Sequence, residues 1–282
     1  MASITPAQII EALSSGALRP EYQDIRDINT GKIICVEQLA RWSEGNKSIS
    51  PSEFLPIAIA YVTDSGDTLM DIITLQFLEQ ARDSLISFLA KKADGGTTID
   101  MQYITINISA DQFINESFMQ RVKEIIPPEL LKYFTLELLE TRSEKVQYQL
   151  ERSPPILDNA FEDIKGHGFK LSLDDVGADF HTLEKIRTSE LHISLNRFDS
   201  IKLDAFLVCP GGYGSRTLPN TDEINQIIAY IKSIRPDGIC CKVICEGVET
   251  NEQLALLKKI PEITYVQGWL FSKAVLFDDI IS

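Results

Sequence analysis

The chain has no long apolar run. Nowhere do about 18 or more consecutive residues carry only apolar side chains, so a membrane-spanning helix is not expected. The opening Met-Ala-Ser-Ile-Thr-Pro lacks a basic segment followed by an apolar one, which excludes a recognisable secretory leader. Cysteine is scarce, with 5 in 282 residues, so a disulfide framework is excluded and a reducing, cytoplasmic location is favoured.

Basic side chains are also under-represented. Lys and Arg number 27 against 41 Asp and Glu, which leaves a formal net charge of −14. This balance excludes direct DNA binding through broad neutralisation of phosphates. It stays compatible with a small anionic ligand whose contacts are mediated by metal ions. The 44% hydrophobic and 24% charged residues are ordinary for a globular domain, and we expect a single domain over residues 1–282.

Short apolar strands alternate with helices along most of the chain. A hairpin is predicted around Asn29-Thr30-Gly31, with strands over 21–26 and 32–37. Further strands are predicted over 103–107, 134–138, 170–174, 191–195, 242–246 and 264–268. This alternation predicts a parallel sheet closed into a TIM-type (β/α)8 barrel, with one antiparallel strand in the initial hairpin. A doubly wound open sheet is the alternative, disfavoured because no Gly-rich phosphate loop follows the first strand.

The stretch Lys170 to Gly177 ends a strand with two adjacent carboxylates. Alone it is compatible with a solvated turn. However, polar oxygens recur at the ends of the other predicted strands: Glu37, Asn107, Glu137, Asp174, Asp175, Glu246 and Gln267. A barrel brings those ends to one face, where carboxylate and amide oxygens suit Mg²⁺, Mn²⁺ or Ca²⁺. The pattern predicts a two-metal site that activates water for phosphodiester cleavage.

These residues also carry a family resemblance. The spaced set Glu37-Gln-Leu39-Ala-Arg41, Asn107-Ile-Ser109, Glu137-Leu-Leu-Glu140, Asp174-Asp175-Val-Gly177, Glu246-Gly-Val-Glu249-Thr and Gln267-Gly-Trp-Leu-Phe-Ser-Lys resembles the EAL domain family. The likeness runs from about Gln23 to Lys273. It implies a TIM-barrel phosphodiesterase that linearises cyclic di-GMP to pGpG with two Mg²⁺ or Mn²⁺ ions. Ca²⁺ is expected to bind without supporting turnover.

The resemblance implies a role for each matched residue. Metal-ligand roles fall to Glu37, Asn107, Glu137, Asp174 and Asp175, with Gln267 completing the site. Glu246 is implied as a metal ligand or as the base that activates water. Glu140 and Glu249 match acids that brace the loop after the double Asp, and Gln23, Leu39 and Arg41 match positions that contact the dinucleotide, with Arg41 on a phosphate.

Several positions depart from the family pattern. Gln38 replaces the Ala of the Glu-Ala-Leu signature, and the loop after the double Asp is rewritten. The family's Leu-Lys-Ile-Asp strand aligns with 191–198, which puts Ser194 or His192 at the lysine position. Loss of one electrostatic group from such a centre costs about 10²–10³ in rate. Weak activity is therefore expected.

Two functions of different class follow. The first is an EAL-type phosphodiesterase acting on cyclic di-GMP. The alternative is a catalytically degenerate EAL domain that serves as a cyclic di-GMP receptor or a protein-interaction regulator. A homodimer is a further hypothesis. Residues 199–221 are expected to form a long loop that is either a surface for a protein partner or a tolerated insertion, and the insertion is favoured because surface loops absorb length cheaply.

Overall fold

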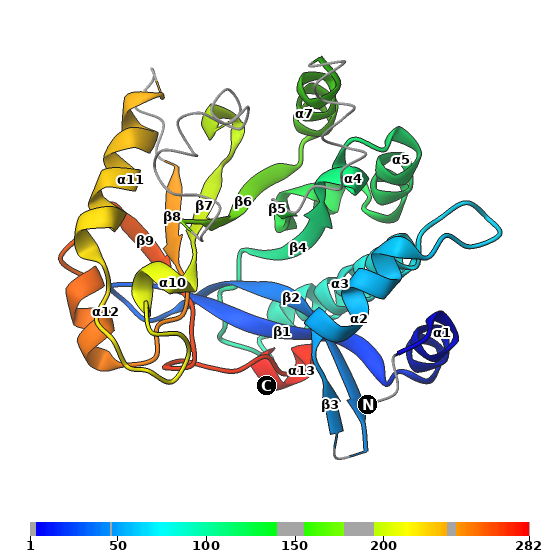
Figure 1. The fold of residues 1–282 in the computed structure, drawn as a ribbon, viewed down its shortest axis with the longest axis horizontal. Coiled ribbons are helices and arrows are strands. Elements are labelled where there is room, and N and C mark those ends of the chain that lie inside the picture. The colour runs from blue at the N-terminus through cyan, green and yellow to red at the C-terminus, as the bar shows by residue number, and fades with distance from the viewer. Residues whose placement is uncertain (1–3, 46, 140–154, 178–194, 236–240, 282) are drawn as a thin grey trace.

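A computed structural model describes residues 4–45, 47–139, 155–177, 195–235 and 241–281. Within these residues, eight strands form a closed ring in the order β1-β9-β8-β7-β6-β5-β4-β2, and β1 pairs with β2 to complete it (Figure 1). The strands are β1 (Leu18–Asp27), β2 (Ile33–Glu44), β4 (Tyr103–Ser109), β5 (Phe134–Leu139), β6 (Lys170–Val176), β7 (Ser200–Leu203), β8 (Lys242–Cys245) and β9 (Ile263–Val266). A short β3 (Lys47–Ile49) extends β2 outside the ring.

The direction of the strands confirms the predicted barrel. β1 runs antiparallel to both of its neighbours, β2 and β9, and the other ring pairs are parallel. The hairpin that reverses β1 turns at Asp27, whose carboxylate accepts hydrogen bonds from the backbone N–H groups of Asn29 and Thr30. Gly31 ends the turn at a φ of 70°, a conformation that glycine adopts without strain.

The sixth ring strand lies elsewhere than predicted. Of the predicted segment 191–195, residues 191–194 lie outside the described residues, and Leu195–Arg197 forms the 3-10 turn η2. The strand is β7, in which Ile201 and Leu203 are fully buried. The alternating pattern at 191–195 is as strand-like as Ser-Ile-Lys-Leu, and a buried lysine argues against a core strand unless carboxylates surround it.

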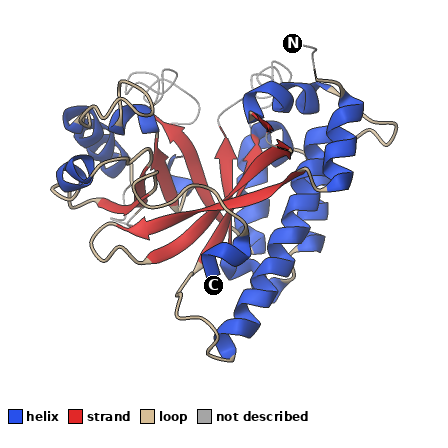
Figure 2. Ribbon diagram, turned by 90° about the horizontal axis from the view of Figure 1, so that it is seen from below, coloured by secondary structure: helices blue, strands red, loops and turns tan. Residues whose placement is uncertain are grey.

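Helices cover the outside of the barrel (Figure 2). They are α1 (Pro6–Ser15), α2 (Pro51–Ala60), α3 (Leu69–Ala93), α4 (Ala110–Phe113), α5 (Glu116–Ile125), η1 (Pro128–Tyr133), α7 (Pro155–His167), α10 (Ala205–Val208), α11 (Thr221–Ser233), α12 (Asn251–Leu257) and α13 (Phe277–Ile281). Edge-to-face contacts of Phe161 with Phe113 and with Phe198, at 4.9 and 5.4 Å, join α7 to the ends of neighbouring elements. In the described part of the chain, every helix is too short or too polar to cross a bilayer.

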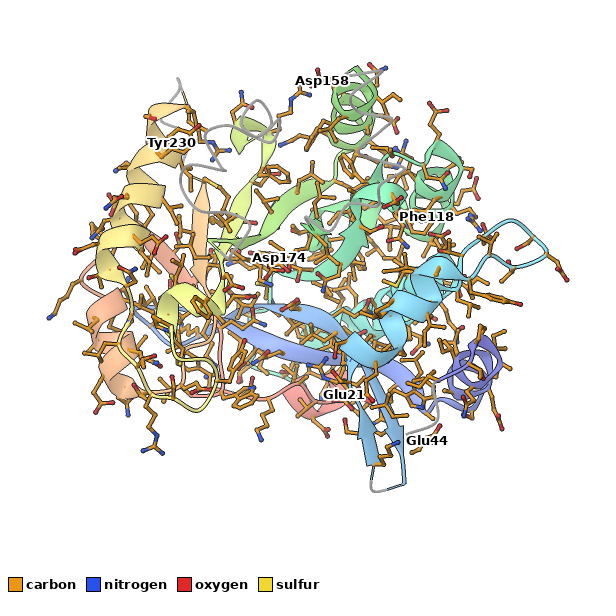
Figure 3. The ribbon with its side chains drawn as sticks, in the orientation of Figure 1. Glu21, Glu44, Phe118, Asp158, Asp174 and Tyr230 are labelled. Atoms are coloured by element: carbon orange, nitrogen blue, oxygen red, sulfur yellow. The ribbon has the colours of Figure 1, made fainter. Side chains whose placement is uncertain are left out.

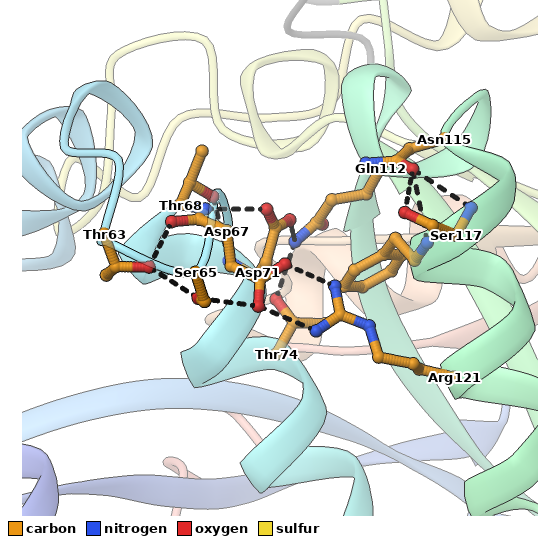
Figure 4. Close-up of polar contacts among 11 residues, drawn as sticks. Thr63, Ser65, Asp67, Thr68, Asp71, Thr74, Gln112, Asn115, Ser117 and Arg121 are labelled. Atoms are coloured by element: carbon orange, nitrogen blue, oxygen red, sulfur yellow. Dashed lines mark hydrogen bonds and ion pairs between the residues drawn. The ribbon is translucent and has the colours of Figure 1, made fainter.

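A buried polar network fixes the end of β4. Ser109 is the N-cap of α4, and its backbone N–H donates to Oε1 of Gln112 at 3.0 Å. The Gln112 amide in turn donates to Asp71 Oδ1 at 3.0 Å and to Thr74 Oγ1 at 3.1 Å, both on α3 (Figure 4). Because Gln112 is buried with both ends of its amide paired, the network sets the direction in which β4 ends, two residues after Asn107.

Candidate active site

The structure brings the predicted strand-end oxygens together at one end of the barrel. Glu37 lies on β2, Asn107 on β4, Glu137 on β5 and Asp174 on β6, and Figure 3 places Asp174 near the centre of the strand ring. The register pairs Asn107 directly with Glu137. Parallel pairing therefore places the side chains of Asn107 and Glu137 side by side.

The two adjacent aspartates reach one site because β6 is irregular there. Neighbouring residues in a regular strand point to opposite faces. Here the pairing with β7 shifts register between Leu173 and Val176, and Asp175 has a φ of 56°, in the left-handed region. Carboxylate oxygens of Asp174, Asp175 and Glu246 consequently lie within 4.8 Å of one another. Oxygens of Glu37, Glu137 and Asp174 form a second such group.

A lysine sits among these carboxylates. Lys202, from β7, is 1% exposed, and its Nζ contacts Glu246 Oε1 at 2.5 Å, Glu137 Oε1 at 2.6 Å, Asp174 Oδ1 at 3.1 Å and Glu37 Oε2 at 3.2 Å. The expectation that the site lacks an ammonium is therefore wrong. Serving four carboxylates at once is what allows a lysine to be buried in a strand.

The alternative lysine positions, His192 and Ser194, lie outside the described residues. Lys202 was missed because the strand was placed about ten residues too early, at 191–195 rather than 200–203. The signal that could have identified it is Ile201-Lys202-Leu203-Asp204, in which two apolar residues alternate with a lysine and a closing acid. That pattern predicts the observed strand β7 once a lysine is accepted as a buried strand residue.

Burial and mutual repulsion shape the charge state of the ring. Desolvation raises the pKa of Glu137, Asp174 and Glu246, and the attraction of Lys202 opposes that rise. Desolvation alone would lower the pKa of Lys202, but the surrounding carboxylates hold it well above its usual value. Lys202 thus stays protonated and offsets the repulsion within the ring.

Two amides hold Glu37 in its ionised form. Asn107 Nδ2 donates to Glu37 Oε1 at 3.1 Å, and Gln267 Nε2 donates to Glu37 Oε2 at 2.7 Å. Although burial opposes ionisation, Lys202 and these two donors lower the pKa of Glu37. Both amides therefore point their nitrogen atoms at the carboxylate and turn their oxygen atoms elsewhere.

Three buried oxygen atoms of the site, including those of the two amides, are suited to binding a cation. Asn107 Oδ1, Gln267 Oε1 and Glu137 Oε2 are buried and have no hydrogen-bond partner among the described residues. A buried oxygen without a donor is costly, and a hard divalent cation satisfies it. Together with the two carboxylate groups, these atoms form an all-oxygen donor set suited to Mg²⁺ or Mn²⁺.

The expected nucleotide contacts lie on the paired strands β1 and β2. Leu39 and Arg41 follow Glu37 at alternate positions of β2, so all three share one face. Gln23, on β1, pairs in register with Glu37, and its Oε1 accepts a hydrogen bond from Gln267 at 3.2 Å. Arg41 is half-buried, with one nitrogen atom on its neighbour's carbonyl at 2.9 Å.

Of the two acids expected to brace the loop after the double Asp, only Glu249 lies within the described residues. Glu140 lies outside the described residues, as does the loop after Gly177. Glu249 is described, and its Oε2 accepts a hydrogen bond from the backbone N–H of Gly214 at 2.8 Å. Glu249 therefore contacts the loop between α10 and α11.

Gln38, the departure from the signature, points away from the site into the core. Its side-chain nitrogen donates to Tyr22 Oη at 3.0 Å and to the carbonyl of Phe77 at 2.8 Å. The backbone carbonyl of Gln38 accepts a hydrogen bond from Asn107 Nδ2 at 3.1 Å, which any residue at position 38 could do. The long amide is thus accommodated without touching the acidic ring.

The sequence model of the EAL domain matches residues 7–274, nearly the whole chain. The chain therefore belongs to the EAL domain family. Ile201-Lys202-Leu203-Asp204 carries that family's Leu-Lys-Ile-Asp pattern, so the lysine taken as missing is present. The same correction shortens the long loop expected at 199–221, because residues 200–203 form β7 and 205–208 form α10.

The chain is also similar in sequence to proteins named as cyclic di-GMP phosphodiesterases. The chain is 27% identical over 285 residues to the probable cyclic di-GMP phosphodiesterase PdeG of Escherichia coli, with 99% of this chain and 49% of PdeG aligned. It is 26% identical to the cyclic di-GMP phosphodiesterase NbdA of Pseudomonas aeruginosa, covering 94% of this chain and 30% of NbdA. The chain thus spans about half or less of the length of these relatives.

A solved structure confirms the fold. The PaMucR phosphodiesterase in complex with c-di-GMP superposes with a TM-score of 0.70 at 23% identity, covering 97% of this chain and 99% of that one. At this identity the likeness establishes the barrel.

Proposed function

We propose that the chain is a metal-dependent phosphodiesterase that binds cyclic di-GMP and hydrolyses it to pGpG. The observation that carries this proposal is the ring of four carboxylates around the buried Lys202 at the strand ends. Three of these carboxylates are buried, which is too costly to keep for a fold that needs only a packed core. The ring supports a site whose carboxylates exchange partners when cations arrive.

The residues that would hold two divalent ions are Glu37, Asn107, Glu137, Asp174, Asp175, Glu246 and Gln267. When bound, Mg²⁺ or Mn²⁺ supplies positive charge for the phosphate and lowers the pKa of a bound water. Lys202 stays charged and places N–H donors beside the carboxylates. It thereby orients them and offers a donor to an oxygen at the reacting phosphate.

Glu246 is the best-placed of the four carboxylates to take the proton of the attacking water. Its side chain is 16% exposed, against 6% for Glu37, 0% for Glu137 and 9% for Asp174. It therefore faces the open side of the ring. Desolvation raises its pKa well above the ordinary value, which makes it a stronger base than a surface carboxylate.

Substrate contacts fall to the face of β1 and β2 that carries Glu37. Arg41 retains most of its guanidinium donors for a phosphate, since one hydrogen bond to the neighbouring carbonyl engages a single nitrogen. Leu39 offers an apolar surface, and Gln23 extends the hydrogen-bonded chain from Gln267.

The test is chromatography of the products after incubation of cyclic di-GMP with the protein in Mg²⁺ or Mn²⁺. We expect pGpG in both metals and none in Ca²⁺. Glu37→Ala should abolish the product, because it removes a carboxylate shared by the lysine and two amides. Glu79→Ala, a matched change of an exposed glutamate on α3, should leave the rate unchanged. Equal rates for both variants would contradict the proposal.

Lys202 removes the missing lysine as a reason to favour a receptor without turnover, whereas the rewritten loop after Gly177 lies outside the described residues. Calorimetric binding of cyclic di-GMP in Ca²⁺, with no product in Mn²⁺, would revive that alternative. A homodimer and a cytoplasmic location are parts of the proposal as well. Light scattering would test the dimer, and the free state of the four cysteines in the described part of the chain supports the location.

A further inference from the structure

The loop between α10 and α11, residues 209–220, presents an exposed aromatic side chain next to a second one. Tyr213 is 58% exposed and Trp269 is 52% exposed. Their rings stack with centroids 5.1 Å apart and an interplanar angle of 27°. More than half of each side chain thus stays open to solvent although the two rings cover part of each other.

Two hydrogen bonds directly after Tyr213 hold the loop in place. Gly214 N–H donates to Glu249 Oε2 at 2.8 Å, and Gln253 Nε2 donates to the carbonyl of Thr217 at 2.8 Å. The turn before Tyr213 admits only glycine at position 211, where a Cβ atom would meet the Ser215 side chain at 2.6 Å. The tyrosine is therefore carried by a tightly turned loop tied to the start of α12.

The aromatic pair belongs to the mouth of the active site. Trp269 follows Gln267 by two residues, directly after β9. Desolvation and then the negative charge of Glu246 and Asp204 raise the pKa of the Tyr213 phenol to about 12, so the phenol lies within electrostatic range of Glu246. Lys273 adds a positive charge, its Nζ lying 5.2 Å from the centroid of Trp269.

We propose that Tyr213 stacks on one purine base of the bound cyclic dinucleotide, with Trp269 as the ring that supports it. This inference rests on the proposed function. Exposed aromatic rings beside a positive charge are how proteins hold single bases and their phosphates, because every base has a π-face. Tyr213 lies outside the motifs that carry the family resemblance, so its contact with the base would add to the contacts that those motifs supply.

The test compares Tyr213→Ala and Tyr213→Phe with the wild type in Ca²⁺. Binding is followed by the quenching of tryptophan fluorescence, which reports on Trp269 because the other tryptophan, Trp42, is 1% exposed. Loss of one base–aromatic stack should weaken cyclic di-GMP binding by about 5- to 150-fold in Tyr213→Ala. Tyr213→Phe should bind like the wild type, since it keeps the ring.

Two controls separate this inference from the proposed function. Leu218→Ala changes an equally exposed apolar residue of the same loop, 58% exposed, and should leave affinity unchanged. Mn²⁺ binding, which involves no base, should be unchanged in Tyr213→Ala because the acidic ring is intact. Wild-type affinity for cyclic di-GMP in Tyr213→Ala would overturn the inference and leave the function standing. A wild type that binds Mn²⁺ but does not bind the nucleotide would overturn both.

Discussion

Replacing Lys202 with Met tests how the acidic ring is held together. The change keeps an unbranched, apolar side chain of similar volume and removes the terminal ammonium. Lys202 contacts four carboxylates at 2.5–3.2 Å, three of them buried, and removing one partner from such a cluster costs about 3–5 kcal/mol. For a domain of this size that loss lowers the melting temperature by about 5–10 °C.

The assay is thermal unfolding in EDTA at pH 8, with Lys232→Met as the matched control. Lys232 pairs with Glu262 at 2.8 Å, but its side chain is 64% exposed, so its loss should cost less than about 1 kcal/mol. Mn²⁺ should restore much of the stability of Lys202→Met, because a divalent cation replaces the missing positive charge among the same oxygens.

The pH dependence supplies a second check on the same variant. Burial raises the pKa of Glu137, Asp174 and Glu246, so these groups take up protons readily as pH falls. Protonation relieves the repulsion that the lysine would otherwise offset, and the stability deficit should shrink toward pH 5. Melting temperatures of wild type and Lys202→Met within about 2 °C of each other at pH 8 in EDTA would refute the reasoning.

Three further outcomes follow from other contacts. Desolvation, and after it the negative charge of Asp174, raises the pKa of Asp175 from 3.8 to about 7. The protonated Asp175 side chain therefore stabilises the fold fully below pH 3.8, and this stabilisation is lost as pH rises to about 7. In EDTA, Asp175→Asn should therefore match the wild type in urea denaturation near pH 4 and exceed it at pH 8; a constant difference would contradict this. Gln112→Leu should lower the free energy of unfolding by about 1–3 kcal/mol, because Asp71 and Thr74 lose their buried donor; urea curves that overlay the wild type would exclude the network. Gln38→Ala should cost a similar amount in stability yet leave the rate of pGpG formation unchanged, and a lower rate would show that Gln38 acts on the site.

Much of the barrel could be predicted because most of its strands are short apolar runs with polar ends. Predicted strands 134–138 and 170–174 are observed as Phe134–Leu139 and Lys170–Val176. Their side chains are buried on both faces, so the apolar pattern is unambiguous. The seven strand-end oxygens could be predicted for a related reason, since a polar side chain that ends a buried strand needs a partner at the barrel mouth.

Strand β7 could not be predicted, because a lysine in a core strand is improbable until its carboxylate partners are in place. A lysine in Ser-Ile-Lys-Leu argues against burial when only local sequence is considered. Its burial depends on Glu37, Glu137 and Glu246, which come from strands far away in the sequence. The stacking of Tyr213 on Trp269 is equally non-local, because the two residues are 56 positions apart in the sequence (269 − 213 = 56).

The measurement that tests the account most directly is the stoichiometry of Mn²⁺ binding, read by electron paramagnetic resonance on metal-stripped protein. The acidic ring, the unpartnered amide oxygens and Lys202 together predict a two-metal centre. We expect two Mn²⁺ per wild-type chain, and fewer in Asp174→Asn, because Asp174 belongs to both oxygen groups. A wild-type chain that binds no Mn²⁺ would contradict the account, since the carboxylates around Lys202 would then have only a structural role.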